Sequence, residues 1–474
     1  MNGADLCPLG DNFGQSPQAG TDTGDAVTLR RAKKRHHGSL LGSGYSSNDP
    51  ADAVLEPLEG YLSHLSSRSP RPCPRRPNRK TTPPPGPDPA GAIRSKIVRI
   101  VLFHGGFGAG GTEKVVALLA RHRAALGDEV HVAGLTEPPN GSFFDYPPEV
   151  SLHVADRESG ASGHGGQLLR FQHTRQCLKQ YRPDIAIAFL TKVNTLTVLA
   201  AMGTGVPVII SERNNPSAQP ASAFWRPLNR FAMARAAAIV MQTERICSEL
   251  PMTLQRRSIV IPNPCSPIGQ PRMAPPEGEG VHLVAVGRLD PQKGFDLLLQ
   301  AFKKIRCRHT DLKLTIFGEG SQREALEGLS KRLGIDDAVR FPGVTAHPGA
   351  WIEEGDIMVL SSRYEGFPNV VAEATVSGLP VVAFDCPYGP RELIEDGRNG
   401  MLVREGDVDA LAEAMSRLAA DPDLRASMRA AAPLNRTRLS EHAVMRLWDQ
   451  TIDATLQKRD LRSVGAVNGV SHKT

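Results

Sequence analysis

Short apolar runs alternate with longer amphipathic segments over most of this chain. A first set of runs, each of the length of a buried strand, lies at 97–103, 129–134, 150–154, 184–190, 206–211, 237–241 and 259–261. A second set lies at 282–286, 312–317, 339–341, 357–360, 381–384 and 401–403. Helical stretches separate the runs, and this alternation is typical of parallel, doubly wound sheets. The pattern predicts an α/β protein with two Rossmann-like domains.

Composition marks where these domains begin and end. The N-terminal part is rich in Gly, Ser, Pro and Arg, and it can bury too little apolar surface to offset the entropy of ordering. A Pro- and Gly-rich stretch at 264–280 indicates a linker between two domains. We therefore predict a disordered extension at 1–95 and a first domain at 96–263. A second domain would follow at 264–437, and a flexible tail at 459–474.

Net charge and cysteine usage narrow the function class. The chain has 474 residues, 40% of them hydrophobic, and a formal net charge of +6, which is mild for this length and indicates no nucleic-acid partner. The seven cysteines are widely spaced and form no Cys-x-x-Cys pair, so they favour a reducing compartment over a disulfide framework or a zinc site. We see no secretory signal pattern and no apolar run of ~18 residues, so we expect a cytoplasmic protein without a membrane-spanning helix.

The segment 356–385 reads as a strand, a loop, a helix and a second strand. A Gly-Phe-Pro-Asn turn follows the first strand, and Asn369 is expected to cap the helix that comes next. Glu365 lies in the loop and Glu373 about one turn into the helix, with seven residues between them. Backbone N–H groups at a helix start favour anions, and nearby carboxylates can bond sugar hydroxyls. The segment therefore predicts a site for a sugar or a phosphate.

A glycine-rich loop follows the first predicted strand. Gly106, Gly108 and Gly111 match Gly-x-Gly-x-x-Gly between a strand and a helix, and Glu137 comes after the second strand. This is the dinucleotide-binding fingerprint in its expected context, so an NAD-dependent enzyme stays open as an alternative. Glycines also let a backbone approach any diphosphate, and the dinucleotide interpretation leaves the second domain unexplained.

Two cations follow the first strand of the second domain. Arg288 and Lys293 lie within Gly-Arg-Leu-Asp-Pro-Gln-Lys-Gly, at the carboxyl end of that strand, where doubly wound folds bind ligands. An Arg fork and a Lys point charge suit a pyrophosphate whose charge grows as its bond to a leaving group breaks. Charge alone would fit two surface cations near a turn equally well.

Together these motifs resemble those of glycosyltransferase family 4, whose members are retaining enzymes of the GT-B fold. The resemblance rests on Glu365-x7-Glu373 with Gly-Phe-Pro-Asn-Val-Val-Ala between them, on Gly-Arg-Leu-Asp-x-x-Lys-Gly, and on a Gly-Gly-Thr-Glu-Lys loop that begins at Gly110. It implies two Rossmann-like domains that face each other across a cleft. The second would hold a nucleotide-diphosphate sugar and the first would hold the acceptor. A last helix at 438–458 would cross back to join the first domain.

The resemblance also implies roles for individual residues. Arg288 and Lys293 would stabilise the departing diphosphate, Glu373 would hold the ribose hydroxyls and Glu365 the hydroxyls of the transferred sugar. Further donor contacts are expected from Gly110, Gly111, Gly318, Glu319, Val344, Gly366, Phe367, Pro368, Asn369 and Val370. In this mechanism the leaving phosphate helps to deprotonate the acceptor, so no protein nucleophile is required.

Polar groups that follow a strand of the first domain are candidates for acceptor contacts. Glu212, Arg213 and Asn214 are assigned to the acceptor or to the donor sugar, and a plain Asx-type turn is the alternative. The Asp-x-Asp pairs at 407–409 and 421–423 lie beyond the core strands, so we interpret them as helix N-caps. We therefore expect no metal and no cofactor other than the nucleotide sugar as co-substrate.

Two segments of the first domain, near 168–182 and 224–235, mix cationic and apolar residues. Basic amphipathic helices bind anionic membrane surfaces, so either segment could make a peripheral membrane contact. Ordinary core residues with solvated charges would give the same pattern.

The sequence as a whole predicts a retaining hexosyltransferase of surface polysaccharide synthesis at the inner face of the plasma membrane. Its donor would be a UDP- or GDP-sugar, with UDP favoured, and its acceptor a saccharide or a polyprenyl-linked glycan. A sugar-nucleotide epimerase of the same GT-B architecture and the NAD-dependent enzyme are the alternatives. A non-catalytic sugar-nucleotide-binding protein is a third, against which the intact Arg288, Lys293, Glu365 and Glu373 argue.

Overall fold

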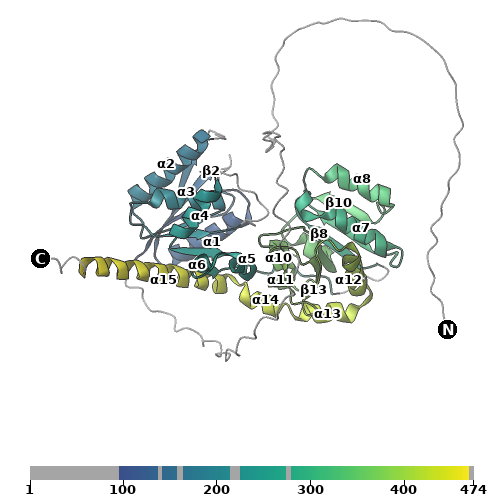
Figure 1. Cartoon of the computed structure of the whole chain (residues 1–474). Coiled ribbons are helices and arrows are strands. Elements are labelled where there is room, and N and C mark those ends of the chain that lie inside the picture. The colour runs from purple at the N-terminus through teal and green to yellow at the C-terminus, as the bar shows by residue number, and fades with distance from the viewer. Residues whose placement is uncertain (1–95, 137–140, 157–163, 214–224, 274–278, 469–474) are drawn as a thin grey trace, which may run out of the picture. The chain divides into compact units, whose positions relative to one another are not determined.

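Two parallel sheets form the framework of the protein (Figure 1), which confirms the predicted α/β class. The computed structural model describes residues 96–136, 141–156, 164–213, 225–273 and 279–468. The first sheet has seven strands in the order β3-β2-β1-β4-β5-β6-β7, and the second has six in the order β10-β9-β8-β11-β12-β13. The predicted extension, 1–95, lies outside the described residues.

The strands fall close to the predicted apolar runs. Those of the first sheet are β1 (Arg99–His104), β2 (Glu129–Thr136), β3 (Val150–Asp156), β4 (Ile185–Phe189), β5 (Val208–Ser211), β6 (Ala238–Met241) and β7 (Ser258–Val260). Those of the second are β8 (His282–Val286), β9 (Lys313–Phe317), β10 (Val339–Gly343), β11 (Ile357–Leu360), β12 (Val381–Phe384) and β13 (Gly400–Val403).

Helices connect the strands and cover the sheets. The first domain contains α1 (Gly111–Ala125), α2 (His164–Tyr181), α3 (Thr191–Ala201), α4 (Trp225–Arg235), α5 (Glu244–Glu249) and α6 (Met252–Gln255). The second contains a 3-10 turn, η1 (Pro291–Lys293), and α7 (Phe295–Arg306), α8 (Arg323–Leu333), α9 (Ala350–Glu354), α10 (Asn369–Ser377), α11 (Pro390–Leu393), α12 (Val408–Ala420) and α13 (Pro422–Ala430). The chain then continues through α14 (Pro433–Arg438) and α15 (Glu441–Asn468).

Alternation of side chains along each strand gives the first sheet two buried faces. On β1, Ile100 and Leu102 pack in a cluster with α1, whereas Val101 and Phe103 pack in another with α2 and α3. Successive side chains of a strand point to opposite faces, so a strand covered on both sides is apolar throughout. This explains why the strands appear in the sequence as unbroken apolar runs.

The last helix packs on the first domain. Helix α15 runs along the first domain in Figure 1, and its Val444, Trp448 and Ile452 belong to the same buried cluster as residues of β1 and β4. A buried ion pair adds to this contact, because Nη1 of Arg123 on α1 lies 2.8 Å from Oδ1 of Asp449. α15 continues through Gly465 to Asn468, into the segment predicted as a flexible tail.

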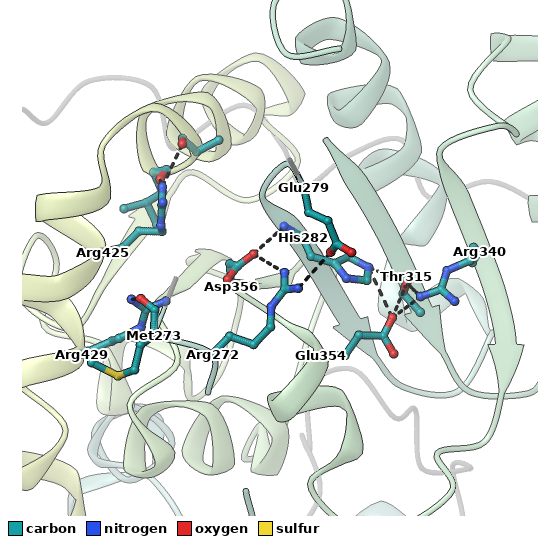
Figure 2. A network of polar contacts seen from close by, with 12 residues as sticks. Arg272, Met273, Glu279, His282, Thr315, Arg340, Glu354, Asp356, Arg425 and Arg429 are labelled. Carbon is teal, nitrogen blue, oxygen red and sulfur yellow. Dashed lines mark hydrogen bonds and ion pairs between the residues drawn. The ribbon is translucent and has the colours of Figure 1, made fainter. Parts of the chain in front are cut away.

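A polar network holds the linker to the amino ends of the second sheet (Figure 2). The carboxylate of Asp356, fully buried before β11, accepts from Arg272 Nη2 at 2.5 Å and from the backbone N–H of His282 at 2.8 Å. The His282 ring in turn lies 2.7 Å from the hydroxyl of Thr315 on β9. Burial lowers the pKa of His282, so the ring is neutral at pH 7. The network is structural, since it lies at the edge opposite to the strand ends that bind ligands in such folds.

No helix in the described part of the chain combines the length and the apolar character that a bilayer span requires.

Candidate active site

The loops that carry the predicted site residues follow the carboxyl ends of parallel strands in both sheets. The glycine-rich loop comes after β1 and leads into α1, while the loop that contains Glu365 comes after β11 and leads into α10. Asn263 follows β7, at the point where the chain leaves the first sheet. Because parallel strands end at one edge, these segments can meet although they are far apart in the sequence.

A cavity of about 210 Å³ brings four of the predicted residues together. Gly110 and Gly111 contribute from the start of α1, and Asn369 and Glu373 contribute from α10. The full lining consists of Ala109, Gly110, Gly111, Lys114, Val115, Phe144, Asn263, Pro264, Cys265, Asn369 and Glu373. The cavity is therefore built jointly by the two domains, as the resemblance implies for a donor site.

Glu373 is a half-buried carboxylate beside a cation. Burial raises its pKa, and the nearby Lys114 acts in the opposite direction. The neighbouring thiol of Cys265 also has its pKa raised, to about 12, first by burial and then by the charge of Glu373. The thiol is consequently protonated and unreactive at pH 7, whereas Lys114 and Glu373 can offer a cation and hydrogen-bond acceptors to a ligand.

Lys293 and Glu365 contact each other directly. Nζ of Lys293 lies 2.7 Å from Oε1 of Glu365, and the two side chains are 15% and 6% exposed. The hydroxyl of Ser362 donates to the same oxygen at 2.6 Å. Both contacts use Oε1, so Oε2 of Glu365 is the oxygen that remains for a hydroxyl of a ligand. The structure thus joins one predicted cation to one predicted carboxylate.

Tight glycine turns hold this pair in place. Gly294, directly after Lys293, has φ +62°, and a Cβ there would lie 2.1 Å from the carbonyl oxygen of Ser361. Gly318 has φ +136°, and a Cβ there would lie 1.9 Å from the carbonyl oxygen of Gly287. Only glycine fits such a conformation and such an approach, which explains the glycines that flank the two strand ends.

Lys293 and Glu365 lie outside the lining of the cavity, as do the remaining predicted donor residues of the second domain. Arg288 has a side chain that is 75% exposed and pairs with Asp290 at 3.2 Å. Glu319 pairs with Arg323 at 2.8 Å, and Val344 is 75% exposed. Gly366, Phe367, Pro368 and Val370 surround the start of α10, where the side chain of Phe367 is buried. Their contacts with a donor stay predictions.

One local expectation is corrected by the structure. Asn369 is not the cap of α10 but its first residue, and Pro368 occupies the cap position. The reason is tertiary: Oδ1 of Asn369 accepts from Nδ2 of Asn263 at 2.7 Å, so its side chain bonds a distant segment instead of its own helix. Gly378 ends the helix in the left-handed conformation, with φ +89°, as its position after Ser377 predicts.

A second contact between the domains lies beside Glu365. The backbone of Glu365 exchanges hydrogen bonds with the loop at 387–388, at 2.7 and 2.9 Å. In that loop the hydroxyl of Tyr388 bonds Glu249 of α5. In the following helix α11, Glu392 accepts from the backbone N–H of Arg245 at 3.2 Å. The loop that holds Glu365 is therefore tied to the first domain.

Of the three predicted acceptor residues, two are buried and one lies outside the described residues. Glu212 is buried and accepts from the hydroxyl of Thr191 at 2.6 Å. Arg213 is also buried, and its Nη1 donates to Oδ1 of Asn263 at 2.5 Å. Asn214 lies outside the described residues, as does Glu137 of the dinucleotide fingerprint. Acceptor contacts by Glu212 and Arg213 stay predictions, although the guanidinium of Arg213 is directed at another residue of the chain.

The two Asp-x-Asp pairs act as predicted. Asp407 caps α12 by accepting from the N–H of Ala410, and Asp421 caps α13 by accepting from the N–H of Leu424. Among the described residues, no His, Cys, Asp and Glu side chains gather in a group that could hold a metal ion.

Sequence reasoning missed Asn263, Phe144 and Cys265 as lining residues, and it gave Lys114 no role of its own. Lys114 was visible as the cation of the Gly-Gly-Thr-Glu-Lys loop. Asn263 had a positional signal, because it lies three residues after the last strand of the first domain and precedes the linker. Phe144 carried no signal, since nothing local shows which way a loop aromatic points.

Two family models match the chain. The model described as "Glycosyl transferase 4-like domain" matches residues 110–264, and the model described as "Glycosyl transferases group 1" matches residues 280–421. The matches fall on the first and the second domain, and together they take in more than half of the 474 residues.

The chain is also similar to curated proteins and to solved structures. An exopolysaccharide phosphotransferase of Streptomyces coelicolor is 32% identical over 281 residues, but this chain spans only 29% of that protein and the alignment takes in 58% of this chain. A diphospho-undecaprenol-linked saccharide 4-alpha-N-acetylgalactosaminyltransferase of Campylobacter jejuni is 26% identical over 349 residues, which are 69% of this chain and 92% of that protein. The Anabaena protein HepE, solved in complex with UDP, is similar in fold with a TM-score of 0.60, 18% identity and coverage of 75% of this chain and 100% of that chain.

Two parallel α/β domains that build one cavity from their strand ends have the GT-B fold. The chain belongs to the glycosyltransferase family that the two models describe, and it is a glycosyltransferase. This confirms the resemblance that the motifs indicated, and it replaces the dinucleotide interpretation of the glycine-rich loop.

Gly111→Ala tests the contact between the glycine-rich loop and α10. A Cβ at Gly111 would lie 2.8 Å from Nδ2 of Asn369, so the amide of Asn369 or the glycine-rich loop must shift. We expect the transfer rate to fall about 10-fold or more, because displacements of about 1 Å at a reacting site cost up to ~10²-fold. Gly108→Ala is the matched control, since no atom lies within 4 Å of its new Cβ. Equal initial rates for the two variants would show that this contact does not govern activity.

Proposed function

We propose that the chain is a retaining glycosyltransferase that moves a hexosyl group from a UDP-sugar to a hydroxyl of a saccharide or of a lipid-linked glycan, as a step of surface polysaccharide synthesis. The observation that carries the proposal is the shared cavity, in which Gly110 and Gly111 of one domain face Asn369 and Glu373 of the other. The Campylobacter relative, named as acting on an undecaprenol-linked saccharide, and the UDP complex of HepE support the choice of donor and acceptor.

The charges fit the departure of a diphosphate. Lys293 is a mostly buried cation held by Glu365, and a charge in such surroundings acts more strongly than one in water. In our proposal Lys293 stabilises the leaving diphosphate, while Oε2 of Glu365 accepts from a hydroxyl of the transferred sugar. Glu373 accepts from the ribose hydroxyls. The side chain of Arg288 is exposed, and in our proposal it turns toward the phosphates when the donor binds.

The step that we propose breaks and forms bonds on one face of the sugar. The bond from C1 to the phosphate oxygen breaks, and its electron pair stays on the leaving diphosphate. The acceptor oxygen forms its bond to C1 from the same face, and its proton passes to the departing phosphate oxygen. No residue of the protein is covalently modified, and the anomeric configuration is retained.

A nucleotide panel tests the proposed donor. We expect UDP to raise the melting temperature more than GDP or ADP at equal concentration, because ligands that bind only the folded state stabilise it. UDP-N-acetylhexosamines are the first sugars to assay, given the name of the Campylobacter relative. Release of UDP that needs a polyprenyl-linked saccharide, with an α-linked product from an α-linked donor by NMR, is the expected result. Isomerisation of the UDP-sugar with no acceptor present would instead identify an epimerase, and a larger shift with GDP would overturn the choice of UDP.

Substitution of the charged residues tests their roles. Lys293→Ala and Glu373→Ala should each lower kcat/KM by ~10²-fold or more, the scale expected when one transition-state contact is lost. Lys303→Ala removes an exposed lysine from α7 and serves as the control, with unchanged turnover expected. Unchanged turnover in either of the first two variants would remove that residue from the mechanism.

We also propose that the protein works at the inner face of the plasma membrane through α2. Leu168 and Leu169 of this helix are 58% and 52% exposed, and Lys179 is exposed on the same helix. Arg175 is occupied differently, since its Nη1 donates to the carbonyl oxygens of Ala200 and Met202 at the end of α3. Exposed leucines and an exposed lysine on one helix suit the interface of an anionic bilayer.

Co-sedimentation with vesicles tests this membrane contact. The protein should bind vesicles that contain anionic lipid, and high salt should release it, because the attraction is screened. Replacing both Leu168 and Leu169 by Ser should weaken binding, whereas Met252→Ser, at another exposed apolar position of the first domain, should not. Binding that depends on neither the lipid charge nor the salt concentration would contradict the proposal.

A further inference from the structure

The side chains of Arg213, Asn263 and Asn369 form a relay of hydrogen bonds that ends at the cavity. Oδ1 of Asn263 accepts from Nη1 of Arg213 at 2.5 Å and from Nε2 of Gln242 at 2.9 Å. Nδ2 of Asn263 then donates to Oδ1 of Asn369 at 2.7 Å. Arg213 and Gln242 follow strands β5 and β6 of the first sheet, whereas Asn369 begins α10 in the second domain. The relay therefore crosses from one domain to the other.

The arginine fixes the direction of every bond in this relay. An asparagine amide can turn by 180°, and its orientation has to be inferred from its partners. A guanidinium has donors only, so the group of Asn263 that faces Arg213 must be the oxygen. That leaves Nδ2 of Asn263 for Asn369, whose oxygen must face it. The remaining group of Asn369, its NH2, is thereby turned away from Asn263.

The free amide group of Asn369 lies at the glycine-rich loop. A Cβ at Gly111 would be 2.8 Å from Nδ2 of Asn369, and both residues line the cavity beside Lys114 and Glu373. A hydrogen-bond donor and an ammonium group thus both belong to residues that line the cavity. Such a pair suits an oxygen acceptor that carries negative charge, such as a phosphate, or a sugar hydroxyl.

Arg213 is held in the interior in a charged state. Its guanidinium lies 5.3 Å from the ring centre of Phe189 and 5.9 Å from that of Trp448 on α15, at distances typical of cation–π contacts. Burial lowers its pKa to about 9, and the charge of Glu212 acts against that shift. Arg213 is therefore still protonated at pH 7 and can only donate.

The stability of the fold does not explain why a cation is buried at position 213. Among the described residues, Nε and Nη2 of Arg213 have no hydrogen-bond partner, and desolvating a charge costs more than a single hydrogen bond returns. An apolar side chain packed against Phe189 and Trp448 would avoid that cost. What an apolar residue could not do is fix the orientation of Asn263.

We propose that Arg213 is a positioning residue, which acts through Asn263 to turn Asn369 so that its Nδ2 donates into the cavity toward an oxygen of the bound nucleotide sugar. The inference rests on the proposed transfer from a nucleotide sugar, and it adds a specific donor and the residues that orient it.

Asn263→Asp reverses the relay without changing its shape. The new carboxylate still accepts from Arg213, and the pair gains a charge, so the melting temperature should not fall. A carboxylate has no donor for Asn369, whose amide must then turn its NH2 toward it and present its oxygen to the cavity. We expect kcat/KM for the nucleotide sugar to fall about 10²-fold, the scale of losing one donor at a reacting site. Gln242→Leu is the matched control, because it removes a donor to the same oxygen and leaves Arg213 in place, and we expect a change within about threefold.

A double-mutant cycle separates this effect from that of the added charge. Asn369→Ala alone should lower kcat/KM about as much as Asn263→Asp, and in the Asn369→Ala background Asn263→Asp should have little further effect. Independent, multiplying losses would mean that the new charge itself repels the donor, and they would overturn the relay. Full activity of Asn263→Asp, or a loss that merely follows a lower melting temperature, would overturn it too.

A measurement without substrate keeps the relay testable by itself. Asn369→Asp still offers an acceptor to Nδ2 of Asn263, whereas Asn369→Leu leaves that buried donor unpaired at a cost of about 1–3 kcal/mol. The Asp variant should therefore melt at a higher temperature than the Leu variant, and the reverse order would overturn the bond directions. If the unmodified protein used no nucleotide sugar, the proposed function would fail, but this melting order would still decide for or against the relay.

Discussion

The parallel direction of the strands is the constraint on which the site depends. Every pair of neighbouring strands in the two sheets is parallel, so their carboxyl ends lie at one edge of each sheet. Segments that follow β1, β7 and β11 therefore reach one cavity, and Asn263 meets Asn369 across 106 positions of sequence. The amino ends of the second sheet carry a different polar network, in which Arg272 and Asp356 attach the linker (Figure 2). The direction of the strands thus places the cavity at the carboxyl ends and the contacts that attach the linker at the amino ends.

Burial decides how the charges of this site act. Lys293 and Arg288 come from one sequence motif, but their side chains differ in exposure. The side chain of Lys293, paired with Glu365, is 15% exposed, whereas that of Arg288, paired with Asp290, is 75% exposed. An exposed pair contributes at most about 1 kcal/mol and leaves the side chain free to move. A mostly buried pair holds both partners in one geometry. The motif therefore supplies one fixed cation and one that can change position.

The last helix connects the end of the chain to the site. Trp448 of α15 packs in the core of the first domain and lies against the guanidinium of Arg213, which in turn bonds Asn263. A helix that contributes no lining residue to the cavity thereby affects the orientation of residues that do. This gives the return of α15 to the first domain a consequence beyond packing, because the orientation of a buried amide depends on a cation that needs aromatic surroundings.

Local patterns in the sequence determined the elements and their order. Strand β1 at Arg99–His104 was visible as an apolar run, and the end of α10 was visible at Gly378, since periodicity and turn residues act within a few positions. The acidic and glycine-rich motifs were equally local, and they sufficed to indicate the family. Only the tertiary structure decided the partners of the side chains. Asn369 was expected to cap its own helix, but it bonds Asn263 instead. The physical reason is that burial and hydrogen bonding depend on segments that are brought together from far apart, and no pattern within one segment encodes which of them will meet.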